Sequence, residues 1–183
     1  MRAWDCQGIP LGMAFAMPFE FNNDTFRGEL MITSIHQLTM TVLMTPDMAN
    51  FSGNVHGGTI LKLMDQVAYA CASRYSGRYV VTLSVDHVTF REAIHVGELV
   101  TFLASVNYTG RTSMEVGIKV MAENIQERTT RHANSCFFTM VAMDESGRPI
   151  EVPVLEPETD EEKSRQAHAM RRRRLRLQQN SEI

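Results

Sequence analysis

The sequence predicts an α+β domain in which an antiparallel sheet wraps around one long helix, followed by a helical tail. Two observations carry this prediction. A loop rich in turn-forming residues leads into a segment whose apolar residues recur at helical spacing. Four segments in which apolar and polar residues alternate come after it, before any further long helix. The chain has 183 residues, which is enough for one domain with a sizeable core.

The first elements are a strand, a loop and the long helix. Residues 31–44 are rich in Ile, Thr, Val and Leu and partly alternate, so they predict the first strand. Residues 45–55 hold Pro, Asp, Asn, Ser and Gly close together, which is typical of a loop. The helix is expected from about Gly58 to Tyr75, with Gly77 as its C-terminal cap.

Four further strands are expected. In residues 81–90 the apolar phase slips, and a bulge near Asp86 or His87 would account for the slip. Residues 100–108 and 114–122 alternate on either side of a short hairpin link at 109–111. Residues 132–143 are apolar on both faces, which indicates a central strand covered on both sides.

The expected organisation has three parts: an N-terminal arm at 1–27, a domain at 28–155 and a charged helical tail at 156–183. The net charge is −3, but the tail carries five arginines between positions 171 and 176. One interpretation is a solvated amphipathic helix with an acidic start and a basic end, which complements its dipole. The other is a basic end that faces phosphate. Nucleic-acid binding is not expected, because the rest of the chain is acidic and its basic residues are not interleaved with aromatic ones.

Composition excludes several other classes. The three cysteines are far apart and no histidines cluster at ligand spacing, so neither a disulfide framework nor a metal site is expected. A reducing cytoplasm suits this pattern. The apolar stretch near the N-terminus lies between Pro10 and Pro18, too short to span a membrane, so no membrane association is expected.

Gly57, Gly58 and Asp65 are the candidate catalytic groups. Backbone amides of the glycines at the helix start could form an oxyanion hole, and the Asp65 carboxylate could activate water or attack directly. The seven residues from Gly58 to Asp65 span about 10 Å along a helix, so one carbonyl cannot contact both. A dimer with antiparallel helices would bring one subunit's glycines to the other's aspartate. The alternative is that Asp65 is an ordinary exposed helix residue.

Other residues of this stretch have ordinary explanations as well. His56 is either a loop or helix-start histidine or a general base, and Asn50 suits a turn for local hydrogen-bonding reasons. Cys71 falls on the apolar side of the helix, where a buried and inert thiol is expected. None of the three indicates catalysis by itself.

A combination of motifs gives a more specific indication. Residues 46–58 follow the pattern Pro-Asp-x-x-Asn-x-x-Gly-Asn-x-His-Gly-Gly, and Asp65, Thr-Leu-Ser-Val-Asp at 82–86 and Gly-Arg-Thr-Ser at 110–113 follow. Over about residues 32–153 this resembles the acyl-CoA thioesterases of the hotdog fold, in the cytosolic acyl-CoA hydrolase branch. The resemblance implies hotdog homodimers, commonly trimers of dimers, and a catalytic pair from opposite subunits that corresponds to Asn50 and Asp65.

The resemblance also implies a reaction and a substrate. The reaction would be hydrolysis of a fatty acyl-CoA to free acid and CoA, without a metal or cofactor. The thioester carbonyl would accept from the Gly58 amide, with Gly57 as a second candidate, and His56 would contact the substrate. CoA would be contacted by Arg111, Thr112, Ser113 and, more weakly, Arg91. For Arg111 the alternative is a solvated turn residue.

Two other functions remain open at this point. The first is a hotdog hydratase or dehydratase acting on the same acyl thioesters, for which His56 beside Asp65 leaves room. The second is a module that binds or senses acyl-CoA without turning it over. Acyl chain-length preference cannot be predicted from the sequence.

Overall fold

A computed structural model describes residues 34–180. The chain divides into two compact units, Met1–Ile32 and Thr33–Ile183, and every described residue belongs to the second. The N-terminal arm expected at residues 1–27 therefore lies outside the described residues. The elements of the second unit, in chain order, are β1 (Gln37–Leu43), η1 (Pro46–Met48), α1 (Gly57–Ser76), β2 (Tyr79–Phe90), β3 (Leu99–Thr109), β4 (Ser113–Asn124), β5 (Thr129–Met143) and α2 (Asp160–Asn180).

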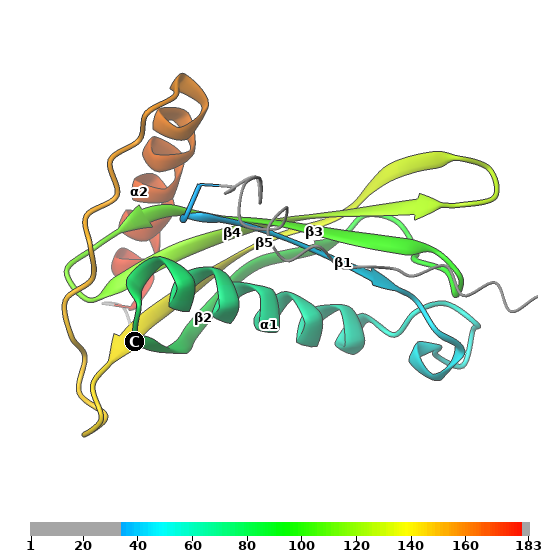
Figure 1. Cartoon of the computed structure of the whole chain (residues 1–183), viewed down its shortest axis with the longest axis horizontal. Helices are drawn as coiled ribbons and strands as arrows, with labels where there is room; N and C mark the ends of the chain where they lie inside the picture. Colours follow the sequence, from blue (N-terminus) through cyan, green and yellow to red (C-terminus); the bar gives the residue numbers. More distant parts are fainter. Residues whose placement is uncertain (1–33, 181–183) are drawn as a thin grey trace, which may run out of the picture. The chain divides into compact units, whose positions relative to one another are not determined.

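The five strands form one antiparallel sheet in the order β1-β3-β4-β5-β2 (Figure 1). Every neighbouring pair is antiparallel. The predicted α+β class, one sheet on one long helix plus a helical tail, is confirmed. Because β1 and β2 pair on one side only, they are the edges of the sheet in this part of the chain, and β2 is the strand that follows α1 directly.

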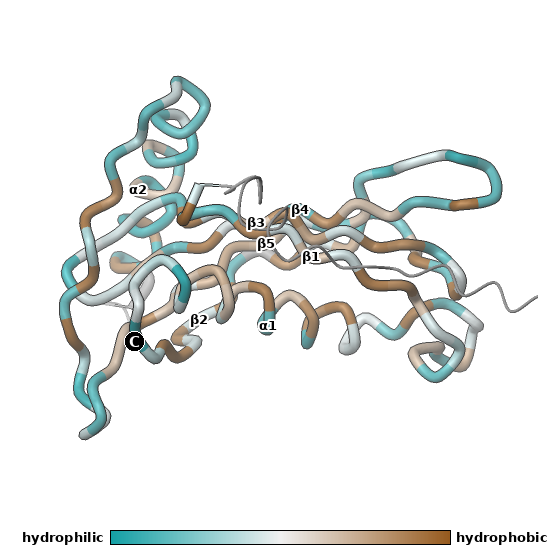
Figure 2. The backbone as a smooth tube through the Cα atoms, viewed as in Figure 1, coloured by the Kyte–Doolittle hydropathy of each residue, from teal (hydrophilic) through white to brown (hydrophobic). Residues whose placement is uncertain are grey.

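Helix α1 lies against one face of the sheet, and its apolar side faces the strands (Figure 2). The buried residues of α1 follow the spacing of one helical face: Ile60, Met64, Val67, Ala68, Cys71 and Ala72. The helix ends at Gly77, which adopts a left-handed conformation with φ of 64° and donates its N–H to the carbonyl of Ser73. The predicted helix and its glycine cap are confirmed.

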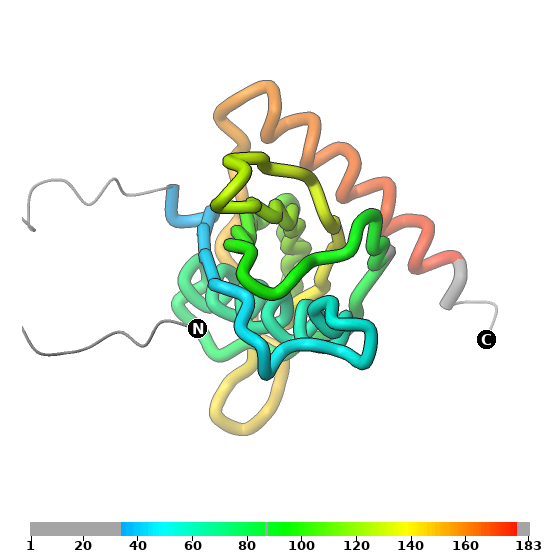
Figure 3. The backbone as a smooth tube through the Cα atoms, turned by 90° about the vertical axis from the view of Figure 1, so that its right-hand side faces the viewer, coloured from blue at the N-terminus to red at the C-terminus, as the bar shows by residue number. Residues whose placement is uncertain are grey.

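The two helices cover opposite faces of the sheet. Neighbouring residues of a strand point to opposite faces, and on β5 Cys136 contacts Met64 of α1 while Phe137 lies beneath Arg172 of α2. Figure 3, seen at right angles to Figure 1, shows α2 running along the outside of the sheet. We call the face toward α1 the inner face and the face toward α2 the outer face.

Two local predictions on the sheet are also confirmed. The β2–β5 register shifts between Asp86 and Thr89, where the phase slip indicated a bulge, and shifts again between Thr82 and Ser84. Strand β5 lies between β4 and β2, and its residues from Phe138 to Ala142 are all buried. A strand covered by helices on both sides needs apolar residues on both faces, which is the pattern that its sequence showed.

Neither interpretation of the tail describes α2 fully. The helix has an acidic first turn, but it is not simply solvated, because Ala169 is fully buried against the sheet. Arg172 and Arg176 are paired with carboxylates of the sheet, Glu115 on β4 and Asp86 on β2. Two of the tail arginines thus attach α2 to the outer face.

Candidate functional site

The structure divides the predicted site residues into two groups at different places along α1. Asn50, His56, Gly57, Gly58 and Arg91 lie around the start of α1, where the end of β2 returns. Asp65 lies two turns further along the helix, beside the first half of β2. We call these the donor half-site and the acid half-site.

The donor half-site surrounds a hollow of about 300 Å³ whose lining includes Asn50, Gly57, Phe90 and Arg91. A Cβ added to Gly57 would lie 3.4 Å from Cζ of Phe90, so the aromatic ring closely approaches the helix start. The Gly57 N–H has no hydrogen-bond partner among residues 34–180, which leaves it able to donate to a ligand at the positive end of the helix dipole.

His56 is the N-cap of α1, and this position changes the role expected for Gly58. The His56 Nδ1 atom accepts the Gly58 N–H at 2.9 Å. A donor already engaged by a cap is not free for a carbonyl oxygen. In this structure Gly57, the second candidate, offers the free amide, whereas the Gly58 amide becomes available only if the His56 ring turns away.

The Asn50 side chain stabilises its own loop through Oδ1, and its Nδ2 group remains able to donate a hydrogen bond. Its Oδ1 accepts from the backbone N–H groups of Ser52 at 2.9 Å and Asn54 at 3.2 Å. The ordinary turn role expected for an asparagine is therefore present. Its Nδ2 group donates no hydrogen bond within the described chain, so the same side chain can also donate into the hollow that it lines.

At the acid half-site, Asp65 accepts one strong hydrogen bond. The Thr82 hydroxyl on β2 donates to Asp65 Oδ1 at 2.6 Å, which fixes the carboxylate beside the edge strand. Asp65 is exposed, and it forms no ion pair with any described residue. It lines a hollow of about 420 Å³ together with Tyr69, Tyr79 and Thr82. A carboxylate that is oriented but carries no counter-cation can accept a proton or attack a carbonyl.

Of the predicted CoA contacts, those of the 111–113 hairpin lie at the same end of the sheet as Asp65. Thr82 pairs with Met140, and Met140 pairs with Met114, the residue after Ser113. Arg111 is exposed, and its backbone carbonyl accepts a hydrogen bond from the Val152 N–H. This bond attaches the segment after β5 to the 111–113 hairpin. The structure therefore groups the 111–113 hairpin with the acid half-site and separates it from Arg91, which lies in the donor half-site.

The two half-sites do not meet within one chain. The hollow at Gly57 and the hollow at Asp65 share no lining residue. Seven residues along α1 correspond to about 10 Å, which is several times the length of a hydrogen bond. One described chain holds the donors in one place and the base in another.

The cysteines of the domain do not provide a nucleophile. Cys71 and Cys136 are buried, and burial raises the pKa of each thiol to about 12. The nucleophilic thiolate form is thereby disfavoured. The inert thiol expected at Cys71 is confirmed. Among residues 34–180 no cluster of His, Cys, Asp or Glu is arranged to hold a metal ion, and no helix is long and apolar enough to cross a membrane.

Thr82 is the site residue that sequence reasoning missed. The sequence shows Thr82 only as part of the 82–86 motif, because nothing in a linear pattern indicates that residue 82 of a strand contacts residue 65 of a helix. The sequence contains one signal: Thr82 is a hydroxyl residue between the apolar residues Val81 and Leu83, in the strand that directly follows the long helix. The short turn at Gly77 makes α1 and β2 run antiparallel, and this brings the two residues together.

Comparisons with known proteins agree with this architecture. The family model described as the thioesterase superfamily matches residues 52–129. Protein VdlD of Helicobacter pylori is 51% identical over 140 residues, which cover 76% of this chain and 80% of the relative. A solved apo-hexameric acyl-CoA thioesterase is 36% identical, with a TM-score of 0.77 over 79% of this chain and 93% of the other.

A third similar protein is the acyl-CoA hydrolase of Staphylococcus aureus, solved with butyryl-CoA, CoA and CoA disulfide. It is 30% identical, with a TM-score of 0.75 over 80% of this chain and 90% of that one. It has also been solved as alanine variants of an asparagine, of an aspartate 15 residues later and of a threonine 17 residues after the aspartate. The present chain belongs to the thioesterase superfamily and, within it, to the hotdog-fold acyl-CoA thioesterases.

Proposed function

We propose that this protein hydrolyses fatty acyl-CoA thioesters to free acid and CoA at sites shared between two subunits of a homodimer. The observation that carries the proposal is the separation of the two half-sites on α1. One half-site holds donors that suit a carbonyl oxygen, and the other holds an oriented carboxylate without a counter-cation. Thioester hydrolysis needs both at the same carbonyl carbon.

In the proposed reaction the thioester carbonyl lies in the donor half-site. The Gly57 N–H and the Asn50 Nδ2 group donate to its oxygen and stabilise the negative charge that develops there. Asp65 of the other subunit takes a proton from water as the water oxygen bonds to the carbonyl carbon. The C–S bond then breaks, and the proton passes to the departing CoA thiolate. A variant of this route, direct attack by Asp65 to form a transient anhydride, uses the same groups.

The edge of the sheet supports dimer formation. Tyr79, Leu83, Val85 and Phe90 on edge strand β2 are large apolar residues at least 40% exposed. An unpaired edge strand with exposed apolar side chains is suited to pairing with another strand. Two copies of β2 related by a two-fold axis would bring α1 of each copy alongside the other in antiparallel orientation. A trimer of such dimers is our proposal for the assembly, in line with the hexameric similar structure.

The spacing of the varied residues in the S. aureus protein supports the choice of residues. Its asparagine, aspartate and threonine are separated by 15 and 17 residues. Asn50, Asp65 and Thr82 have the same separations in the present chain. We therefore propose that Thr82 positions Asp65. We propose Asn50 as the side-chain donor to the carbonyl oxygen in the donor half-site. The 111–113 hairpin and Arg91 are proposed to contact CoA phosphates, which suit arginine's planar fork.

The hydratase alternative is less well supported by the position of His56. A general-base histidine needs an unprotonated ring nitrogen that faces the substrate. His56 Nδ1 accepts the Gly58 N–H as a helix cap, so the neutral ring carries its proton on Nε2. The acyl-CoA sensor alternative does not account for the Thr82 hydroxyl that orients Asp65 at 2.6 Å. Hydrolysis uses both features of the site, and we propose no second function.

The test is release of the CoA thiol from a panel of acyl-CoAs, short to long, followed with a thiol reagent. The wild type is expected to turn over, and Asp65→Asn and Asn50→Ala are expected to lose about 100-fold or more in kcat, which is typical of losing a general base or an oxyanion donor. Asp47→Asn is the matched control, since Asp47 is an exposed aspartate on η1. Undiminished turnover in Asp65→Asn would contradict the proposal; tight acyl-CoA binding without turnover in the wild type would favour a sensor.

A further inference from the structure

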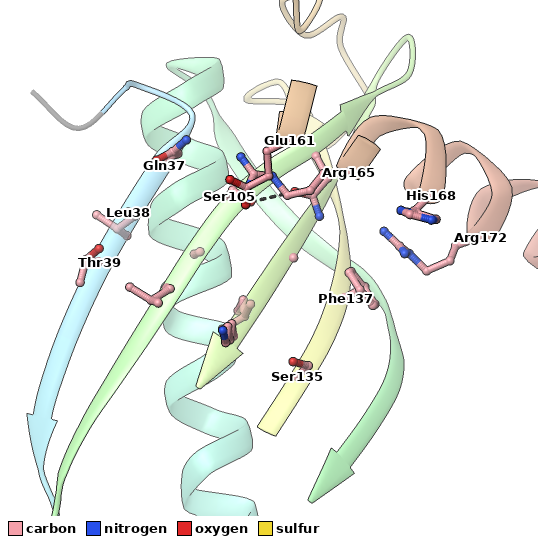
Figure 4. A pocket seen from close by; sticks show the side chains of 16 residues that line it. Gln37, Leu38, Thr39, Ser105, Ser135, Phe137, Glu161, Arg165, His168 and Arg172 are labelled. Atoms are coloured by element: carbon pink, nitrogen blue, oxygen red, sulfur yellow. Dashed lines mark hydrogen bonds and ion pairs between the residues drawn. The ribbon is translucent and has the colours of Figure 1, made fainter. Parts of the chain in front are cut away.

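A further hollow lies away from both half-sites, on the outer face. It has a volume of about 540 Å³ and is lined by residues of strands β1, β3, β4 and β5 and of helix α2. Figure 4 shows Arg165, His168 and Arg172 of α2 above a floor that includes Ser105, Ser135 and Phe137. Since α1 covers the inner face, this outer-face hollow takes no part in the proposed hydrolysis.

The hollow exists because small residues occupy its floor. Ser105, Gly117 and Phe137 are successive partners across β3, β4 and β5, and Ser135 lies two residues before Phe137. The Ser105 and Ser135 side chains are short, and they leave room beneath α2 that larger ones would fill. Hollows of several hundred Å³ are the size that takes small ligands.

A buried amide faces this space. Asn107 is only 4% exposed and lines the hollow, and its Oδ1 accepts the Ser105 hydroxyl at 2.7 Å. Its Nδ2 lies directly over Gly117, so close that an added Cβ there would meet it at 2.3 Å. Nδ2 donates no hydrogen bond to any residue within 34–180. This amide group is open to the hollow, where it can donate to a ligand acceptor.

The charges of the hollow favour a single negative charge. Glu115 neutralises Arg172 at 2.6 Å, and Arg165 lies between Glu161 at 2.6 Å and Glu162 at 3.9 Å. Lys119 also lines the hollow, and it forms no ion pair with any described residue. One uncompensated lysine matches a monoanion better than a polyphosphate.

The lining also has apolar side chains. Leu103 and Phe137 belong to it on the outer face, and Leu103 is 41% exposed. We propose that the outer-face hollow binds a monocarboxylate with an apolar chain, the carboxylate against Lys119 and the Asn107 amide and the chain over Leu103 and Phe137. The free acid from acyl-CoA hydrolysis belongs to this class. That connection rests on the proposed function, but the binding site does not.

The test is equilibrium dialysis of radiolabelled octanoate against the full chain, compared with octanol and ATP. The wild type is expected to bind octanoate, and Lys119→Met is expected to weaken binding about tenfold or more through loss of a charge-assisted contact. Ser105→Leu, which fills the hollow, should abolish it. The matched control is Arg171→Met, because Arg171 is an exposed cation of α2 that does not line the hollow.

The outcomes separate this site from the half-sites. Asp65→Asn should retain octanoate binding at the outer-face hollow, and none of these measurements requires turnover. If the protein does not hydrolyse acyl-CoA, the octanoate measurements therefore still test the outer-face hollow. The proposal is overturned by octanoate binding that Lys119→Met does not weaken, by absence of octanoate binding in the wild type, or by ATP or octanol displacing octanoate at equal concentration.

Discussion

Carboxylates on the two faces of this protein have opposite surroundings. On the outer face, Asp86 and Glu115 of the sheet and Glu162 of α2 are each held by a cationic or histidine partner: Arg176, Arg172 and His36. Beside α1, Asp65 is exposed and has a hydroxyl as its hydrogen-bond partner. Carboxylates whose charge is compensated attach a helix to a sheet. A carboxylate that is oriented and has no cation beside it can accept a proton or attack a carbonyl. We therefore assign the reaction to the α1 side.

The pair beneath α2 should be the most costly to break. Glu115 is 4% exposed and Arg172 is 21% exposed, and the guanidinium also stacks on Phe137 at 3.5 Å from the ring centroid. Arg172→Met leaves a buried carboxylate without a cation, so the free energy of unfolding should fall by about 3 kcal/mol. Urea denaturation measures this fall. Arg171→Met, in the neighbouring exposed position, should change stability little, and an equal loss in both variants would contradict the distinction.

The Thr82 hydroxyl should matter for activity and little for stability. Removing a hydrogen bond to a charged acceptor loses about 1.5 to 3 kcal/mol, so Thr82→Val should lower kcat by roughly 10- to 100-fold. Asp65 is exposed, and water can replace the lost donor without unfolding the chain. Thr82→Ser keeps a hydroxyl and should recover most of the rate. A Thr82→Val enzyme with wild-type kcat would show that this contact does not position the base.

The smallest expected effect comes from Glu162, and it is a change in stability that depends on pH. The Thr159 backbone N–H, together with that of Glu158, donates to its carboxylate, and with the His36 ring these contacts lower its pKa to about 2 against the opposing effect of burial. A carboxylate whose folded pKa is lowered stabilises the fold above its unfolded pKa and loses that contribution as pH falls toward the folded one.

The corresponding measurement compares Glu162→Gln with the wild type in urea at several pH values. The wild type should be the more stable at neutral pH, and the difference should shrink between about pH 4.5 and pH 2. The exposed neighbour Glu161 provides the control, since Glu161→Gln removes a carboxylate of the same helix turn that accepts no backbone N–H from any described residue. A difference that stays constant down to pH 2 would rule out the ionised Glu162 cap as its source.

The sequence was sufficient for the fold and for most of the α1 side. Period-two segments, the apolar spacing of α1 and the Gly77 cap all depend on local backbone geometry, so a linear pattern shows them. The separation of Gly58 from Asp65 could be derived as well, because it follows from helical rise alone.

What escaped prediction depends on contacts between distant residues. Neither the Thr82–Asp65 hydrogen bond nor the pairing of Arg172 and Arg176 with the sheet can be found from spacing within one element. The His56 cap that engages Gly58 depends on a side-chain rotamer. The sequence identified the glycines as a pair, and only the structure distinguishes the free Gly57 amide from the occupied Gly58 amide.

The shared site is the central claim, and complementation between subunits tests it most directly. Asn50→Ala and Asp65→Asn chains are coexpressed with different affinity tags, and mixed dimers are purified through both tags. In each mixed dimer one site has both residues intact and the other has neither, because a two-fold interface pairs the donor half-site of each chain with the acid half-site of its partner. We predict CoA release well above either parent, approaching half the wild-type rate. Mixed dimers no more active than the parents would show that Asn50 and Asp65 do not act across the interface.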